Sequence, residues 1–321
     1  MHFGTGKRGY MSYTNKKFEE LNVIDDFLMN AVATDETVGI PFCRAVLSVL
    51  LQRKIGKIRV MAQRAIPALT PTMRGIRLDV EVEEYGEETD ISLPSMNMYD
   101  IEPNLRKNLN LPKHNRFYQA KIDSRRLKSG EKDFSRLPNL YVISITDFDP
   151  FGYDHMMYTI KNHCMELSDM VYEDGLQFIY FYTKGSKGGN EEIKAMLNYI
   201  QNSTEKNVTN SVIREIHKYV EEVRIQPEVK EEYMTLEDII YYEREEERLA
   251  TQQEEKVQAV FDLLEDYGEL PDKLQQRLKE ETDFDILKAW LKFAAKVQSI
   301  SEFEQGMDEV KELAISRKTV K

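Results

Sequence analysis

Two stretches of sequence decide the fold: Arg77-Leu78-Asp79-Val80-Glu81-Val82 and, further along, Tyr99-Asp100-Ile101-Glu102-Pro103-Asn104. In each stretch apolar and polar residues alternate, which is the period of a half-buried β-strand. Turn-forming residues lie between them, at Tyr85-Gly86 and from Pro94 to Asn97. We therefore expect a hairpin in which Asp79 and Glu102 project from one face. Close carboxylates repel each other unless a cation neutralises them, and oxygen ligands suit a hard ion such as Mg²⁺.

Basic residues flank both stretches. The interval from Gly39 to Leu78 contains no acidic residue, and the interval from Asn104 to Lys128 contains eight basic residues against a single acid. Phosphodiester hydrolysis needs a metal ion to activate water and a positive surface to hold the phosphates. The pattern therefore favours a nucleic-acid-cleaving site, with Arg116, Lys121 and Arg125 predicted to contact DNA.

Several stretches in a fixed order resemble one known family. They are Arg77-Leu78-Asp79-Val80, Tyr99 to Asn104, Arg116-Phe117-Tyr118-Gln119-Ala120-Lys121-Ile122-Asp123, Tyr141-Val142-Ile143-Ser144-Ile145, Phe148-Asp149-Pro150-Phe151-Gly152 and Glu232-Tyr233-Met234-Thr235-Leu236. Together they resemble the recombination-promoting nuclease family, whose members are also described as transposases, within the PD-(D/E)XK nuclease superfamily. The resemblance runs from about Leu21 to about Glu247.

The resemblance implies an α/β fold with a PD-(D/E)XK restriction-endonuclease-like core, a mixed central sheet flanked by helices in the order helix, three strands, helix, strand. The periodicity of the sequence agrees with it independently. It predicts helices at 18–32, 40–51, 117–127 and 191–201, the last capped by Asn190, and strands at 58–65, 76–83, 98–102, 140–146 and 177–183.

The resemblance also implies a catalytic site. Asp79, Glu102 and the backbone carbonyl of Pro103 are expected to hold Mg²⁺ or Mn²⁺. The third motif position is usually lysine and in this family commonly glutamine, whereas this chain has Asn104. Asparagine orients a water by hydrogen bonding, but it has no charge and is one methylene shorter than glutamine.

The implied function is that of a magnesium-dependent DNA endonuclease acting on double-stranded DNA, in recombination or mobile-element activity. The alternative is a catalytically weak or inactive nuclease-like protein that binds nucleic acid or a protein partner through the same basic surface. The departure at Asn104 separates the two.

Auxiliary residues have two interpretations each. Asp26 matches an acidic position in the family's first helix, where it has either a metal-related or a helix-stabilising role. Tyr118 and Gln119 contact DNA or order the site, or else Tyr118 belongs to the core under its helix. The acidic run 147–152 follows a predicted strand and is interpreted as a turn.

Composition limits the class of protein. The chain has 321 residues, of which 41% are hydrophobic, and it has no apolar run of the ~20 residues that a membrane span needs. Two scattered cysteines, Cys43 and Cys164, and no signal peptide suggest a reducing cytoplasm. The net charge of −12 is concentrated in Glu221–Glu255, which has 13 acidic and four basic residues. The acidic part of the chain therefore need not contact DNA.

The expected organisation has four parts: a flexible tail at 1–15, a nuclease-like domain at 16–205, an acidic helical connector at 206–255 and a small helical domain at 256–321. In the last part, apolar residues from Val257 to Ala294 recur at the spacing of three amphipathic helices, which include Trp290. This all-α extension serves protein contact or homodimer formation, or it packs onto the nuclease-like domain.

Overall fold

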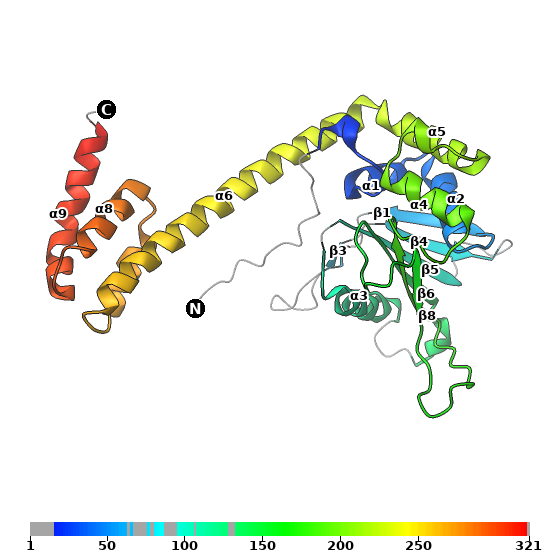
Figure 1. Ribbon diagram of the computed structural model, residues 1–321, viewed down its shortest axis with the longest axis horizontal. Coiled ribbons are helices and arrows are strands. Elements are labelled where there is room, and N and C mark those ends of the chain that lie inside the picture. The colour runs from blue at the N-terminus through cyan, green and yellow to red at the C-terminus, as the bar shows by residue number, and fades with distance from the viewer. Residues whose placement is uncertain are drawn as a thin grey trace. The chain divides into compact units, whose positions relative to one another are not determined.

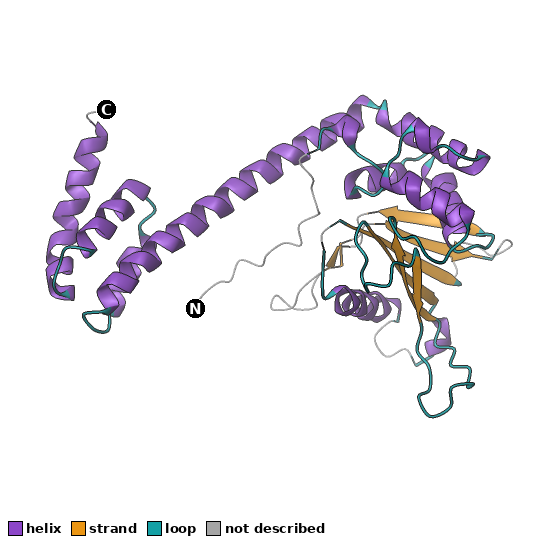
Figure 2. Cartoon of the chain, viewed as in Figure 1, coloured by secondary structure: helices purple, strands orange, loops and turns teal. Residues whose placement is uncertain are grey.

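The computed structural model describes residues 16–62, 65–66, 76–77, 80–86, 95–105, 107–127 and 132–319 (Figure 1). These residues divide into two units, the first ending at Tyr233 and the second beginning at Met234. The first unit is a mixed α/β structure and the second is all-helical (Figure 2). The expected tail at 1–15 lies outside the described residues.

An open, mixed β-sheet forms the centre of the first unit. The strands are β1 (Lys57–Ala62), β2 (Ala65–Ile66), β3 (Ile76–Arg77), β4 (Val80–Tyr85), β5 (Asn97–Asn104), β6 (Asn139–Thr146), β7 (Met157–Ile160) and β8 (Leu176–Tyr182). Within the described ranges the main sheet has six strands in the order β1-β4-β5-β6-β8-β7. β1, β4 and β5 are antiparallel, β5, β6 and β8 are parallel, and β7 runs antiparallel to β8. β2 and β3 pair with each other separately.

The predicted pairing of the two fold-deciding stretches is confirmed. β4 and β5 are antiparallel neighbours, with Val80 opposite Ile101 and Val82 opposite Tyr99. β5 is an interior strand, because it also pairs with β6 on its other side. In β4, all six residues are buried. The residues that alternate with valine in β4 are therefore buried as well, although a polar strand face usually contacts water.

Helices cover both faces of the sheet. On one side lie α1 (Asp26–Thr34), α2 (Gly39–Leu50), α4 (Glu191–Gln201) and α5 (Ser211–Arg224), and on the other lies α3 (Leu111–Arg126) (Figure 1). As predicted, Asn190 caps α4, since its side-chain oxygen accepts a hydrogen bond from the Ile193 amide at 2.9 Å. α3 packs through Ile122 onto Met98, Leu140 and Val142 of the sheet.

Several element boundaries differ from the sequence-based expectations. The predicted helix at 18–32 is a 3-10 turn, η1 (Phe18–Glu20), followed by α1. The crossover helix expected at 117–127 begins at Leu111, where Pro112 lies in its first turn and needs no amide donor.

α5 was expected to belong to the acidic connector, but it packs against α1, α2 and α4. The reason is its apolar stripe of Ile213, Ile216, Val220 and Val223, all of which are buried.

The second unit is built from helices around one core. Its helices are the C-terminal part of α6 (Pro227–Glu265), α7 (Asp272–Glu280), α8 (Phe284–Ala294) and α9 (Ile300–Thr319). Trp290 is buried among leucine, valine and phenylalanine side chains, and its indole nitrogen donates to the Met307 carbonyl at 2.8 Å. Three of these helices were expected, and α9 is an addition that closes the core with Phe303 and Met307.

Every helix in the described part of the chain is either too short or too polar to cross a lipid bilayer.

Candidate active site

The candidate site lies on the face of the sheet that α3 covers. Along β5, Met98, Asp100, Glu102 and Asn104 point to one face and the intervening residues to the other. Met98 packs against Ile122 of α3, which identifies the face. Glu102 therefore lies on the α3 side of an interior strand, where its residue is only 5% exposed.

The expected partner of Glu102, Asp79, lies outside the described residues. The residue after it, Val80, begins β4 and pairs with Ile101, the neighbour of Glu102 in β5. The strand that follows Asp79 therefore runs directly beside the strand that contains Glu102.

Two further acids of β4 lie on the same face. Glu81 is opposite Asp100 and Glu83 is opposite Met98, so both side chains point toward α3. We call Glu81, Glu83, Asp100 and Glu102, all of them buried, the acidic sheet face. Sequence reasoning assigned no role to Glu81, Glu83 or Asp100.

Arginines compensate part of this buried charge. Arg126 in the last turn of α3 contacts Glu83 at 2.5 Å and Glu81 at 2.9 Å, and Arg125 approaches Glu81 at 3.7 Å. Arg59 of β1 contacts the second oxygen of Glu83 at 2.5 Å. Burying carboxylates is costly unless such partners are present. In the sequence, the feature that could have predicted this neutralisation is the Arg125-Arg126 pair at the end of a helix that follows an acidic hairpin.

The titration of these acids follows from their surroundings. Burial alone would raise the pKa of Glu83, but hydrogen bonds from Tyr85 and Arg126, with the charge of Arg126, outweigh it and hold the pKa below its usual value. The pKa of Asp100 lies well above its usual value because the carboxyl is buried and because Glu81 is negatively charged. Neither oxygen of Asp100 has a hydrogen-bond partner among the described residues.

Asn104 lies at the end of β5, two residues beyond Glu102. Its side-chain amide donates to the main-chain carbonyl of Glu102 at 2.9 Å. The carboxamide nitrogen thus points back along the strand with one of its two N–H groups engaged, and the other N–H and the side-chain oxygen can still bond a water. Pro103, between them, lies opposite Ile145 in the parallel pairing with β6.

Tyr118 and Gln119 sit on α3. Tyr118 packs against the core between α3 and the sheet, beside the ring of His114 at 4.1 Å between centroids. Gln119 donates to Asp123 one turn later at 2.5 Å. These contacts agree with the packing interpretation of Tyr118, and the site-ordering role of both residues stays a prediction.

The predicted DNA-contacting residues divide into two groups. Arg116 is exposed, whereas Lys121 is half-buried and lies over the exposed ring of Phe117 at 5.6 Å. The Arg125 side chain is only 22% exposed and lies against the buried carboxylate of Glu81. Its charge is therefore directed into the protein, not toward a ligand on the helix surface.

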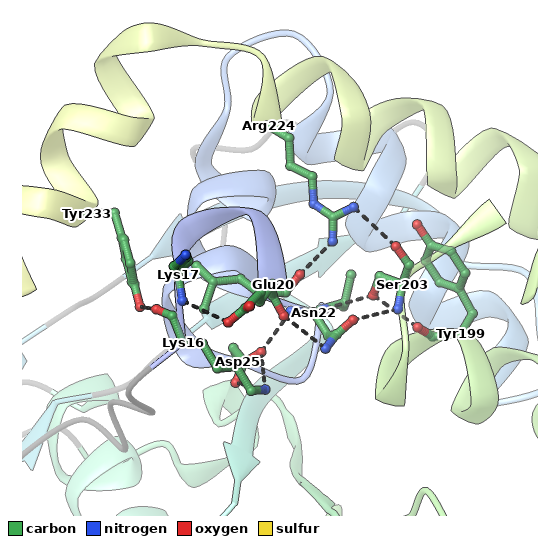
Figure 3. Close-up of polar contacts among 11 residues, drawn as sticks. Lys16, Lys17, Glu20, Asn22, Asp25, Tyr199, Ser203, Arg224 and Tyr233 are labelled. Carbon is green, nitrogen blue, oxygen red and sulfur yellow. Dashed lines mark hydrogen bonds and ion pairs between the residues drawn. The ribbon is translucent and has the colours of Figure 1, made fainter. Parts of the chain in front are cut away.

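Asp26 is the first residue of α1 and is buried, and α1 packs on β1 and β4. The chain leading into α1 is held by distant residues (Figure 3). The Val23 amide donates to the Ser203 hydroxyl at 2.8 Å, and Arg224 donates to the Leu21 carbonyl at 2.5 Å. The position of Asp26 at the head of α1 is thus well defined, and a metal-related role for it stays a prediction.

The acidic run at 147–152 forms the turn that the sequence predicts. The carboxylate of Asp149 accepts hydrogen bonds from the amides of Phe151 at 3.0 Å and Asp154 at 2.6 Å. The side chain is therefore occupied in stabilising the loop after β6.

The chemistry of the donors at the site suits a hard divalent ion. Glu102 and the Pro103 carbonyl offer oxygen atoms, which Mg²⁺ and Mn²⁺ prefer. In the part of the chain that the structure describes, no three His, Cys, Asp or Glu side chains form a metal-binding group. The expected ligand set is therefore complete only with Asp79.

Comparisons of this chain with family models, with curated proteins and with solved structures found no match.

Proposed function

We propose that this protein is a magnesium- or manganese-dependent DNA endonuclease with a PD-(D/E)XK-like core. The observation that supports it most is the arrangement of β4, β5 and α3. An interior strand places Glu102 beside the strand that follows Asp79, and the next helix carries the exposed Arg116 and the half-buried Lys121. A site for a cation and a surface for phosphates thus arise from one continuous segment of chain.

In this proposal Asp79, Glu102 and the Pro103 carbonyl hold the ion. The ion, when bound, lowers the pKa of a water and stabilises charge on the phosphate oxygens. The side-chain amide of Asn104, which is held in place by its hydrogen bond to the Glu102 carbonyl, orients the attacking water. The exposed face of α3 binds the backbone of double-stranded DNA. A role in recombination or mobile-element activity rests on the family resemblance.

A second candidate is a binding protein of the same fold without catalytic activity. Two features of Asn104 favour it. The side-chain amide of Asn104 is hydrogen-bonded to the main chain. Asparagine also lacks the positive charge that a lysine at the third motif position would supply to the transition state. Such a protein retains the basic surface of α3 and binds DNA without cutting it.

Supercoiled plasmid incubated with the purified protein, with and without Mg²⁺ or Mn²⁺, tests the proposal. We expect nicked or linear product only with metal, and a loss of at least a hundredfold in Glu102→Gln and in Asp79→Asn, because each loses a ligand charge with little change in volume. Asp147→Asn is the control, since this partly exposed acid pairs with Lys184 after β6. Unchanged cleavage by both site variants contradicts the assignment, whereas DNA binding without any cleavage by the wild type supports the second candidate.

A further inference from the structure

The acidic sheet face has more carboxyl groups than the proposed metal site uses. Glu102 is one expected ligand, whereas Glu81, Glu83 and Asp100 lie on the same face and are each no more than 1% exposed. Buried acids close to a cation site compete with the intended ligands for the ion. Some feature of the protein must prevent this competition if one ion is to bind at Glu102.

Arg126 has the geometry for that task. One nitrogen of its guanidinium contacts Glu83 at 2.5 Å and another contacts Glu81 at 2.9 Å, so a single planar group bridges two carboxylates two residues apart on β4. The same group lies 2.9 Å from the sulfur of Met98 on β5. A guanidinium fits such a fork, whereas an ammonium is a point charge.

The position next to this bridge could otherwise accept a cation. Asp100 lies opposite Glu81 in the β4–β5 pairing, and both of its oxygens lack hydrogen-bond partners among the described residues although it is fully buried. Glu81 and Asp100 together offer oxygen atoms only, the donor type that Mg²⁺ and Mn²⁺ prefer. The guanidinium of Arg126 occupies one oxygen of Glu81 at 2.9 Å, and Arg125 approaches the other oxygen at the longer distance of 3.7 Å.

We propose that Arg126 is a positioning residue that keeps the divalent ion at Glu102, by occupying Glu81 and Glu83 with a fixed internal cation and thereby blocking a second site at Glu81 and Asp100. The inference rests on the proposed metal-dependent function. It also explains why the arginine comes from α3: the residue that blocks the second site anchors the helix whose outer surface is proposed to bind DNA.

Manganese binding measured by isothermal titration tests the inference without any need for cleavage. We expect one Mn²⁺ per chain in the wild type, two in Arg126→Met, and one again in the double variant Arg126→Met with Glu81→Gln. Arg59→Met is the matched control, because Arg59 contacts the same Glu83 at 2.5 Å from the neighbouring strand β1. It should bind one ion.

A single ion of unchanged affinity in Arg126→Met, together with a lower melting temperature, overturns the inference and leaves Arg126 a purely stabilising residue. If Arg126→Met does not fold, Arg126→Gln with Glu83→Gln decides, since this pair removes one charge of each sign and takes the guanidinium of Arg126 away from Glu81. It should bind two ions, and one ion overturns the inference. A wild type that binds no ion while Arg126→Met binds one contradicts the proposed function and the ion at Glu102, but it supports the inference that Arg126 blocks a cation site at Glu81 and Asp100. No binding by either protein contradicts both.

Discussion

Asn104 has one hydrogen bond that holds its side-chain amide in place. Its nitrogen donates one of its two hydrogens to the Glu102 carbonyl at 2.9 Å, so the second N–H and the side-chain oxygen can still bond a water. Replacing it by lysine adds a charge that stabilises the transition state, and glutamine restores the reach of the family's usual residue. We expect Asn104→Lys or Asn104→Gln to raise the rate of plasmid cleavage several-fold. Asn104→Ala is the decisive comparison: cleavage at the full wild-type rate would exclude a water-orienting role.

The lowered pKa of Glu84 makes the stability of the first unit depend on pH. Burial raises its pKa, but hydrogen bonds from Arg53, the Gly56 amide, Tyr99 and Asn97 outweigh burial and lower the pKa from 4.5 to about 2. A carboxyl whose folded-state pKa is depressed stabilises the protein fully above its unfolded pKa, and this stabilisation is lost as the pH falls toward the folded pKa.

We therefore expect the free energy of unfolding of the first unit to fall by about 3 kcal/mol between pH 5 and pH 2 through this residue, since each pKa unit corresponds to about 1.4 kcal/mol. Urea titrations followed by circular dichroism over this pH range measure it. Glu84→Gln should be less stable at pH 7 and show a shallower loss in acid. Parallel curves for the two proteins contradict the assignment.

The burial of the acidic residues in β4 could not be predicted from the sequence. Alternation in Val80–Tyr85 predicts the strand, but it cannot tell a solvent-facing glutamate from one covered by a helix. Glu81 and Glu83 are buried because α3 ends over β4 and supplies Arg126, a contact between residues more than 40 positions apart. The positions of Glu102 and Asn104 on β5 were predictable because they follow from the alternation of a single strand.

At the scale of elements, α3 separates charges with different tasks. Arg116 is exposed and Lys121 is half-buried, whereas Arg125 lies against Glu81. We expect the pair Arg116→Gln and Lys121→Gln to weaken DNA binding and to flatten the slope of log affinity against log salt by roughly two units, about 0.9 per lost phosphate contact. Fluorescence anisotropy in Ca²⁺ over a range of KCl concentrations measures the slope.

Arg125→Gln is the comparison within the same helix. It should lower the melting temperature, because Glu81 loses a neighbouring cation in a buried setting, and it should leave the salt slope nearly unchanged. If the slope of log affinity against log salt flattens by a full unit in Arg125→Gln, Arg125 contacts a DNA phosphate.

Elements with a strong local period were predicted, and those defined by distant packing were not. The hairpin of β4 and β5, the strand β6 and helix α4 follow from alternation or from a cap such as Asn190. β7 has four residues and is a strand only because it pairs with β8. α5 had a readable apolar stripe, from Ile213 to Val223, that the acidic composition of the following segment obscured.

At the scale of the whole molecule, the single tryptophan of the chain reports on one unit. Trp290 lies in the core of the second unit, with its indole bonded to Met307, and the first unit has no tryptophan. Unfolding followed by tryptophan fluorescence therefore measures the second unit alone, whereas far-ultraviolet circular dichroism measures both. We expect the two transitions not to coincide, since each unit has its own core. Coincident transitions at every denaturant concentration contradict independent folding.

A substitution in the second core tests whether the units are also independent in function. Leu287 is fully buried in the cluster around Trp290, so Leu287→Ala should lower the stability of that unit by about 2–4 kcal/mol through lost packing and the cavity left behind. Because Glu102 and α3 belong to the first unit, metal-dependent cleavage at 25 °C should be unchanged. A chain truncated after Glu247 is the complementary test: it should retain cleavage, and its aggregation would show that the second unit covers apolar surface of the first.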